Sequence, residues 1–540
     1  MLPNPSQLRH PMQTRLRSGI SKPKQIFNLS ASTSAHSTPT SYNQAAKHKH
    51  WRSAMVAEFR ALQSNGTWTL VPPPTDKHIL GSKWTFKEKL NPAGQVSSHK
   101  ARLVAQGCSQ EFGVNFTETF SPVAKMVTIR MLITVALTQN WPIKQLDVSN
   151  AFLHGDLLEE VYMKQPKGFE DSTNPKHVCK LRKSIYGLRQ SPRQWFQKLT
   201  KFLQTMGFRF SSSDPSLLQF HQNNTRLYVL IYVDDILITG NNNTKLDEIL
   251  QRLRSEFSLK QLGDISLYLG IQVIKTPYGY FLSQSHYAQS LLSNAGFADC
   301  KPAPSPSSTQ TTSASDDTPI SDPHSFRKLA GSLQYLSITR PDIAFATNSF
   351  FQKMHLPNNS DYQALKRLLR YLKGTIQYGL PIKTGSTQLR CYTDADWAAN
   401  QADRKSISGF CTFLGPNLIS WSVKKQNTVA RSSTEAECRS LSAATTDVLW
   451  LRRLASDLGI PQSAPNTIHC DNISAIALAK NPVFHARTKH IEIDHHFISG
   501  HIQNGNIRVI HLGSLDQIAD ILTKTLPIKR FLDLRSKLTI

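Results

Sequence analysis

The 540-residue sequence has few cysteines, and their pattern argues against two classes of protein. Its seven cysteines are an odd number, lie scattered along the chain and form no Cys-x-x-Cys pair. Zinc ribbons and disulfide-stabilised folds need paired cysteines at regular spacing, so neither is expected, and a reducing compartment is favoured. No run of 18 or more uncharged apolar residues occurs, so a transmembrane helix is not expected.

Acidic residues are scarce as well, above all at the start of the chain. No acidic residue precedes Glu58, and the same region has no apolar core typical of a secretory signal, so we do not expect a secreted protein. Residues 1–44 are basic and rich in Ser, Thr and Pro, which predicts a disordered tail. A transit peptide has a similar composition, but a flexible basic tail explains the region equally well.

Positive charge is what the sequence has in excess. The 63 Lys and Arg residues outnumber the 37 Asp and Glu residues, which gives a formal net charge of +26 at pH 7. A surplus of this size attracts polyanions, with nucleic acid first and an anionic membrane second. A globular protein that is simply basic remains the alternative at this point.

Composition divides the rest of the chain into four segments. Residues 45–297 alternate strand-like and helical runs, which indicates a mixed α/β unit, and residues 298–325 have the Pro, Ser and Thr content of a linker. Residues 326–385 form a predicted helical connection, in which "SDYQALKRLLRYLKGT" places four leucines on one stripe of an amphipathic helix. A second α/β unit is expected over residues 386–540.

The apolar run "LYVLIYVDDILITG" contains two adjacent carboxylates, Asp234 and Asp235. We expect a hairpin with these acids at its bend, because a bend lets both side chains project beyond a buried strand pair. Two carboxylates so close repel unless they are protonated or bridged by a cation, and hard divalent ions with oxygen ligands suit them best. Asp147, at the end of "IKQLD", offers a third carboxylate, although a helix N-cap is its alternative role.

Longer stretches around these acids resemble the copia-type reverse transcriptases of long-terminal-repeat retrotransposons. The matching segments are "KARLVAQG", "TFSPVAK", "QLDVSNAFLHGDLLEEVYMKQPKGF", "CKLRKSIYGLRQSPRQW", "YVDD" and "LYLGIQV", in this order along the chain. The resemblance implies a multidomain α/β and α+β protein. Its first part would be a right-hand polymerase with fingers and palm, and a ribonuclease H-like α/β domain would follow.

The resemblance also assigns roles by position. It implies that Asp147, Asp234 and Asp235 are the catalytic, metal-binding triad, and that Phe152 is the aromatic gate that excludes the ribose 2′-hydroxyl of a nucleotide. Further nucleotide contacts would come from Lys100, Arg102, Tyr186 and Gly187, and primer or template contacts from Ser191, Pro192, Leu269 and Gly270. Taken singly, these residues are ordinary core, turn or surface positions, and only their combination favours the functional interpretation.

The second α/β unit contains four further carboxylates. "CYTDADW" has Asp394 and Asp396 on one side of a predicted strand, and Glu437, Asp471 and Asp520 follow in "STEAEC", "HCDN" and "LDQIADILTK". Asp394, Glu437, Asp471 and Asp520 together resemble the Asp-Glu-Asp-Asp set with which ribonuclease H binds two divalent ions. The resemblance also implies that His511 occupies the position of a loop histidine that aids product release.

Local roles compete for some of these positions. Ser432 and Glu435 fit a capping box, S-x-x-E, which would leave Glu437 to face the site, whereas Asp471 could itself cap a helix. Cys438 stands where the family usually has an aromatic residue, and we expect it to alter packing alone. Four histidines invite a zinc hypothesis, which we reject because no cysteine lies at ligand spacing: His485, His490, His495 and His496.

The sequence therefore predicts an RNA-directed DNA polymerase with ribonuclease H activity. Each site would use two Mg²⁺ ions, with Mn²⁺ as a substitute, and the partners would be an RNA template, a DNA primer, an RNA–DNA hybrid and dNTPs, without a membrane. The resemblance implies a capsid and an integrase from the parent element and cytoplasmic virus-like particles, with the nucleus as a second location. Two alternatives stay open: a truncated or domesticated fragment that binds nucleic acid without catalysis, and a nuclease or integrase whose N-terminal half is inert.

Overall fold

The computed structural model describes residues 38–90, 96–257, 259–309, 317–400, 402–481 and 491–540. The chain divides into two units, Met1–Thr38 and Pro39–Ile540, and every helix and strand described below lies in the second. The predicted tail, residues 1–44, lies mostly outside the described residues. The other predicted domain boundaries stay predictions. Within the described ranges, no helix combines the length and apolar character that crossing a bilayer requires.

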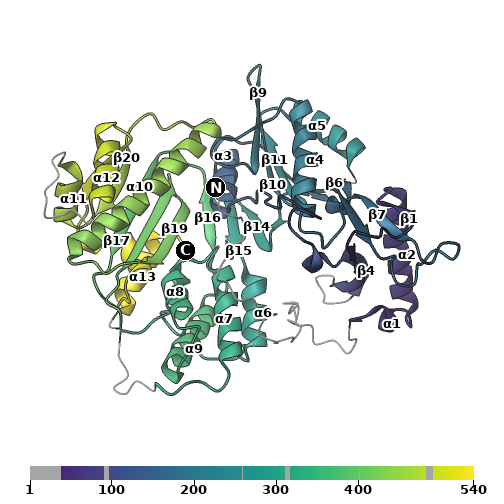
Figure 1. The fold of residues 1–540 in the computed structure, drawn as a ribbon. Helices are drawn as coiled ribbons and strands as arrows, with labels where there is room; N and C mark the ends of the chain where they lie inside the picture. The colour runs from purple at the N-terminus through teal and green to yellow at the C-terminus, as the bar shows by residue number, and fades with distance from the viewer. Residues whose placement is uncertain (1–37, 91–95, 258, 310–316, 401, 482–490) are drawn as a thin grey trace, which may run out of the picture. The chain divides into compact units, whose positions relative to one another are not determined.

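The N-terminal part of the described chain contains a four-stranded sheet in the order β1-β7-β6-β2 (Figure 1). Its core packs around Leu80, Leu103, Val161 and Leu181, with buried residues of α2 among them. A long hairpin, β3 with β4, accompanies it. The elements are α1 (Tyr42–Ala45), α2 (Lys49–Ser64), β1 (Trp68–Val71), β2 (Ile79–Leu80), β3 (Ser82–Leu90), β4 (Val96–Ala105), η1 (Gly107–Ser109), β6 (Asp156–Met163) and β7 (Val178–Lys183).

A six-stranded sheet in the order β12-β5-β11-β10-β9-β8 follows. Its elements are α3 (Met126–Thr138), β5 (Ile143–Val148), η2 (Ala151–His154), α4 (Ser191–Thr205), β8 (Arg209–Phe210), β9 (Leu217–Gln222), β10 (Thr225–Tyr232), β11 (Asp235–Gly240), α5 (Asn243–Glu256) and β12 (Leu259–Asp264).

This sheet is buried on both faces, which explains the unbroken apolar run in the sequence. Leu230 and Leu237 belong to the core cluster that contains the residues of α3. Ile231 and Ile236, one position along each strand, belong to the cluster that contains residues of α4 and α5. Successive side chains of a strand point to opposite faces, so a strand covered on both sides has no polar positions. The run is a buried hairpin, as predicted.

A smaller sheet, β13-β14-β15-β16, and the helices α6 to α9 form the region after the six-stranded sheet. The elements are β13 (Leu267–Tyr268), β14 (Ile271–Thr276), β15 (Gly279–Ser283), α6 (Ser285–Asn294), α7 (Pro323–Leu336), η3 (Pro341–Ile343), α8 (Ala344–Gln352), α9 (Asn359–Gly374) and β16 (Leu380–Lys383). The predicted amphipathic helix is confirmed as α9, whose four stripe leucines are fully buried. The predicted helical connection also contains a strand, β16, which pairs with β15.

The last sheet has five strands in the order β19-β18-β17-β20-β21. The first three pair antiparallel, whereas β20 and β21 run parallel to β17, and α10 packs against β17 and β18 (Figure 1). The elements are β17 (Leu389–Ala395), β18 (Ile407–Leu414), β19 (Asn417–Lys425), α10 (Ser433–Asp457), β20 (Asn466–Cys470), α11 (Ile473–Lys480), α12 (Glu492–Gln503), β21 (Ile507–His511), η5 (Ser514–Asp516), η6 (Ile518–Leu522) and α13 (Ile528–Lys537). The predicted fold class, a multidomain α/β and α+β protein, is confirmed.

Candidate active sites

Strand pairing brings the first three candidate carboxylates together. Asp147 of β5 and Asp235 of β11 are direct partners in the antiparallel register. Tyr232 pairs with Asp235 across the hairpin, so Val233 and Asp234 form a two-residue turn between β10 and β11. Because directly opposed residues have Cβ atoms about 4.5–5.5 Å apart, all three acids gather at one end of the sheet. Asp147 lies within a strand and is therefore no helix N-cap.

The electrostatics of this cluster favour an external cation. Burial, followed by the neighbouring carboxylates of Asp234 and Asp147, raises the pKa of Asp235 to about 6. None of the ion pairs formed by the described residues involves any of these three acids. The donor set consists of carboxylate oxygens alone, which is the chemistry that hard divalent ions prefer. The cluster thus fits the metal ions that the sequence predicts.

The turn that carries Asp234 has an unusual backbone and two anchors. Val233 has φ of 57°, a left-handed conformation that is strained for a β-branched residue. The indole Nε1 of Trp195, on α4, donates a hydrogen bond to the carbonyl oxygen of Val233 at 2.7 Å. The backbone N–H of Val148 donates to the carbonyl oxygen of Asp234 at 3.0 Å. Sequence reasoning missed Trp195, although it closes the motif "SPRQW".

Aromatic and basic side chains extend from this turn toward β4. The rings of Phe152 and Tyr186 meet edge to face with centroids 5.2 Å apart. Burial raises the pKa of Tyr186, and Asp234 and Asp147 contribute to the rise, so its ring lies near the carboxylates. The guanidinium of Arg102 lies 4.6 Å from the centroid of the same ring. The structure therefore places Phe152, Tyr186 and Arg102 in one continuous group beside the three acids.

Lys100 lies two positions before Arg102 on β4, on the same side of that strand. Burial raises the pKa of Glu58, and Arg102 and Lys100 partly offset this effect, so both cations lie near that carboxyl. The two predicted cations are thus neighbours.

Gly187 and Ser191 support the backbone behind Tyr186. Gly187 has φ of +95°, and a Cβ atom at this position would collide with the carbonyl oxygen of Ala105. The buried hydroxyl of Ser191, the first residue of α4, donates to the carbonyl oxygen of Ile185 at 2.6 Å, and Pro192 follows in the first turn. In this structure the Ser191 hydroxyl therefore binds the protein's own backbone.

Leu269 and Gly270 form the turn between β13 and β14. Both residues have positive φ, 52° and 76°. The hydroxyl of Tyr335, on α7, donates to the carbonyl oxygen of Leu269 at 2.7 Å, which fixes the turn from behind. The preceding residue, Tyr268, is buried, and Asp235 is among the groups that raise its pKa. The predicted primer turn thus directly follows a residue that lies near the Asp235 carboxylate.

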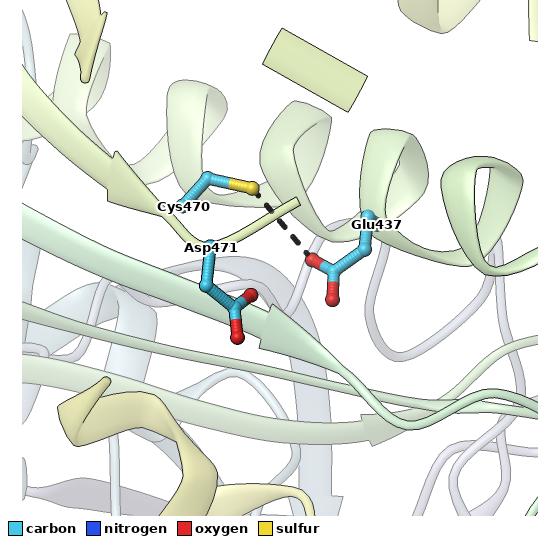
Figure 2. A group of neighbouring side chains, drawn as sticks. All are labelled: Glu437, Cys470 and Asp471. Carbon is cyan, nitrogen blue, oxygen red and sulfur yellow. Dashed lines mark hydrogen bonds between the residues drawn. The ribbon is translucent and has the colours of Figure 1, made fainter. Parts of the chain in front are cut away.

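The four carboxylates of the second candidate site also converge. Asp394 lies on β17, Glu437 on α10, Asp471 just after β20 and Asp520 on η6. Ligand atoms of Asp394, Asp471 and Asp520 all lie within 4.8 Å of one another, as do those of Glu437, Cys470 and Asp471. Figure 2 shows the second group, with the Cys470 thiol directed at the Glu437 carboxylate over 3.9 Å. The two groups share Asp471, so the four acids line one site.

The structure resolves two local alternatives at this site. Asn472 is the N-cap of α11, and its side chain accepts a hydrogen bond from the N–H of Ala475 at 2.9 Å. Asp471 is therefore no cap, and its carboxylate accepts a hydrogen bond from the Ser514 hydroxyl instead. Ser432 caps α10 as predicted, while Glu435 accepts from the N–H of Arg431, which differs from the reciprocal bond of a capping box.

Asp396, predicted to share a strand face with Asp394, lies just beyond the end of β17. Its carboxylate accepts a hydrogen bond from the backbone N–H of Ile407, and burial raises its pKa to about 6. It belongs to neither group of possible metal ligands among the described residues.

Two cations that sequence reasoning missed hold part of this site. The Nζ of Lys524 lies 3.0 Å from Oδ1 of Asp394 and 2.7 Å from Oδ1 of Asp520. Arg530 donates to the other carboxylate oxygen of Asp520 at 3.2 Å. The spacing of Lys524 four residues after Asp520 was the available sequence signal for this cation.

Burial, followed by the Asp394 charge, raises the pKa of Glu437 well above its usual value.

Known proteins similar to this chain identify its family. The model of the family "Reverse transcriptase (RNA-dependent DNA polymerase)" matches residues 65–309. The Retrovirus-related Pol polyprotein from transposon RE1 of Arabidopsis thaliana is 46% identical over 534 residues, which cover 98% of this chain and 36% of the relative. The Uncharacterized mitochondrial protein AtMg00810 of the same plant is 48% identical over 225 residues, 42% of this chain and 94% of that protein. The chain belongs to the copia-type reverse transcriptase family.

This copia-type chain spans about a third of the Pol polyprotein from transposon RE1. A solved structure, that of the foamy viral protease-reverse transcriptase in complex with RNA/DNA hybrid, is 11% identical with a TM-score of 0.47. That structure covers 89% of this chain, and the match covers 56% of its own chain.

The remaining predicted residues of the copia-type chain belong to its C-terminal part, residues 386–540. His511 ends β21, exposed, opposite Cys470 in the strand register. Cys438 is fully buried in the core between α10 and the sheet, which agrees with a role in packing. His495 is buried, and its Nε2 faces the carbonyl oxygens of Leu478 and Asn481. His485 and His490 lie outside the described residues, so the rejection of zinc stays a prediction.

Proposed function

We propose that this chain is an RNA-directed DNA polymerase with ribonuclease H activity. Residues 45–297 would copy RNA into DNA, residues 298–325 and 326–385 would be a linker and a connection, and residues 386–540 would cleave the RNA strand of the hybrid. The observation that carries the proposal is the register that sets Asp147 directly opposite Asp235, beside the turn residue Asp234. Membership of the copia-type family supports the same activity.

In the polymerase site, Asp147, Asp234 and Asp235 would hold the metal ions. Two Mg²⁺ ions, or Mn²⁺ in their place, would supply the positive charge that stabilises an in-line phosphoryl displacement. Phe152, backed by the ring of Tyr186, would form the wall beside the nucleotide sugar and exclude a 2′-hydroxyl. Arg102 with Lys100 would bind the triphosphate.

Other residues of the polymerase site would position nucleic acid. Gly187, Ser191 and Pro192 would hold the backbone that faces the nucleotide and template, because their contacts fix the start of α4. The turn of Leu269 and Gly270, anchored by Tyr335, would support the primer end.

In the second site, Asp394, Glu437, Asp471 and Asp520 would hold divalent ions for hydrolysis of RNA. The high pKa of Glu437 means that its carboxyl binds a proton readily while the site lacks a divalent ion, and would release it when such an ion binds. His511, exposed at the end of β21, would lie at the entrance and aid product release.

The partners follow from the charge and the family. A net charge of +26 would hold an RNA template, a DNA primer and their hybrid through phosphate contacts, so binding should weaken steeply with salt. dNTPs would be the small-molecule substrates. The capsid and integrase of a parent element, and cytoplasmic virus-like particles as the location with the nucleus second, are proposed from membership of the family.

The test measures two reactions on the purified chain. We expect Mg²⁺-dependent dNTP incorporation on a primed RNA template and cleavage of a labelled RNA–DNA hybrid. Asp234→Asn should abolish incorporation alone, and Asp394→Asn cleavage alone. Asp264→Asn and Asp403→Asn, which remove exposed acids paired with Lys144 and Lys425, are the matched controls and should retain both.

Full incorporation by Asp234→Asn would overturn the polymerase assignment. Nucleic acid binding without either reaction would favour the fragment that binds without catalysis.

A further inference from the structure

The ammonium group of Lys524 lies where a divalent ion would bind in the second site. Among the described residues, Asp394, Asp471 and Asp520 form one of the two groups whose ligand atoms are close enough to share an ion, and the one made of carboxylates alone. Nζ of Lys524 contacts Oδ1 of Asp394 at 3.0 Å and Oδ1 of Asp520 at 2.7 Å, and thus joins two members of that group. An ion bound to the same oxygens would lie about 2.0–2.1 Å from each of them. The ammonium and the ion cannot occupy this position together.

The remaining contacts show why the ammonium can leave. Arg530 donates to Oδ2 of Asp520, and Thr523 donates through its hydroxyl to Oδ2 of Asp394, so both carboxylates keep a partner when Lys524 moves. The side chain of Lys524 is 38% exposed, whereas Asp394 is 1% exposed and Asp520 10%. A cation at the rim of a site can turn toward solvent without being left buried and unpaired.

We propose that Lys524 is a resident counter-ion of the ribonuclease H-like site, which a divalent ion must displace from Asp394 and Asp520. Lys524 is then a positioning residue that sets the metal affinity of the site. It keeps the carboxylates close together and partly neutralised in the metal-free chain, and it weakens the first binding of metal. The inference rests on the proposed function only in that the second site binds divalent ions.

If Lys524 competes with a divalent ion, removing it should raise the metal affinity of the site, which loss of a merely structural lysine would not do. Removing the ammonium leaves the carboxylates repelling one another, which should destabilise the metal-free chain and strengthen its attraction for a divalent ion. A structural role alone predicts that loss of Lys524 disorders the site and weakens metal binding. The two explanations therefore predict opposite changes in metal affinity.

The experiment measures Mn²⁺ binding by the electron paramagnetic resonance signal of the free ion. The full chain carries Asp234→Asn and Asp235→Asn, so that binding reports on the second site. Lys524→Met should bind Mn²⁺ about tenfold more tightly than the same chain with Lys524, a change equivalent to about 1.4 kcal/mol. The matched control is Lys529→Met, which removes an exposed charge on α13 and should leave the affinity unchanged.

A second variant guards against misfolding of Lys524→Met. Lys524→Arg keeps the charge and offers a planar fork of donors to the two carboxylates, so it should be harder to displace and should weaken Mn²⁺ binding several-fold. Equal or weaker Mn²⁺ binding by a folded Lys524→Met overturns the inference. If that variant fails to fold, as judged by circular dichroism, unchanged affinity in Lys524→Arg overturns it.

Hybrid cleavage by the same preparations separates the inference from the proposed function. The Mg²⁺ concentration for half-maximal cleavage should fall in Lys524→Met and stay constant in Lys529→Met. Tighter Mn²⁺ binding without cleavage by any chain would support the inference and contradict the proposed nuclease. Cleavage with equal Mn²⁺ affinity in all variants would overturn the inference alone, and absence of Mn²⁺ binding in every chain would overturn both.

Discussion

The indole of Trp195, on α4, and the carbonyl oxygen of Val233, in the turn between β10 and β11, are joined by a hydrogen bond of 2.7 Å. Trp195 is fully buried, and Val233 is held in a left-handed backbone conformation that its branched side chain disfavours. A strained turn persists only when its surroundings fix it, and this bond is one of the two that do so. Trp195 therefore positions Asp234 without belonging to the carboxylate cluster.

Replacing Trp195 with Phe keeps most of the ring and removes the donor. Leaving this partly buried carbonyl unpaired should lower the free energy of unfolding by about 1–3 kcal/mol. Loss of position at Asp234 should lower dNTP incorporation by about 10- to 100-fold, since small displacements of a reacting group are costly. Trp84→Phe is the control, because its buried indole also donates to a carbonyl, that of Lys167. Equal losses of incorporation in both variants would show that the effect is general destabilisation.

Phe152→Ala should open the wall beside the sugar. The ring packs edge to face on Tyr186, and its removal leaves space where a 2′-hydroxyl would enter. The ratio of ribonucleotide to deoxyribonucleotide incorporation should rise about 10- to 200-fold, the range for removing one steric contact. Phe152→Tyr keeps the ring and should keep discrimination. A constant ratio in both variants, measured by single-nucleotide extension, would reject Phe152 as the gate.

Tyr335→Phe should loosen the turn of Leu269 and Gly270. It removes one hydrogen bond, at a cost of about 1 kcal/mol in unfolding free energy, and frees a turn whose residues both have positive φ. We expect a higher KM for primer–template and unchanged hybrid cleavage. Tyr287→Phe is matched, because its ring packs against Tyr335 and its hydroxyl has no hydrogen-bond partner in the described part of the chain. A similar rise in KM for both variants would contradict the assignment.

The pKa of Asp235 makes stability depend on pH in the absence of metal. In the folded chain the pKa is about 6, whereas in the unfolded chain it is about 3.9. Between these values the unfolded chain ionises first, so the contribution of Asp235 to stability is full below pH 4 and is lost as the pH rises through 6. With chelator present, Asp235→Asn should therefore be more stable than the unsubstituted chain at pH 7.

The free energy of unfolding of Asp235→Asn should exceed that of the unsubstituted chain by about 1–2 kcal/mol at pH 7. This is less than the full pKa shift implies, because the carboxylate is partly solvated. The difference should close as the pH falls to 4, and added Mg²⁺ should reverse it at pH 7. Urea unfolding followed by tryptophan fluorescence at several pH values would measure it. A difference that does not change with pH would contradict the predicted shift.

The sequence locates the carboxylates but does not show how they meet. The apolar run around Asp234 and Asp235 predicts a buried hairpin, because both faces of the strands lack polar residues. The partnership of Asp147 with Asp235 depends on the register of strands far apart in the chain, which is set by tertiary packing. Likewise, Asp471 and Asn472 are equally good N-caps by composition, and only the structure selects Asn472.

Lys524 shows a second limit of prediction from the local sequence. Its spacing from Asp520 is visible in the sequence and is that of an ordinary ion pair on a helix. Its contact with Asp394 requires that η6 pack against β17, which no local feature indicates. Trp195 is similar, because its motif is recognisable while its partner, a backbone carbonyl, has no sequence signature.

The order in which the carboxylates occur along the chain has a consequence during synthesis on the ribosome. Asp147, Asp234 and Asp235 emerge together with the strands that pair them, whereas Asp520 follows β21 near residue 511 and comes roughly 285 residues after Asp235. At about 5–20 residues per second, the ribosome needs roughly 15–60 seconds more to deliver it. A nascent chain can thus complete its first carboxylate cluster while the second still lacks an acid, so the two proposed activities would arise at different times during synthesis.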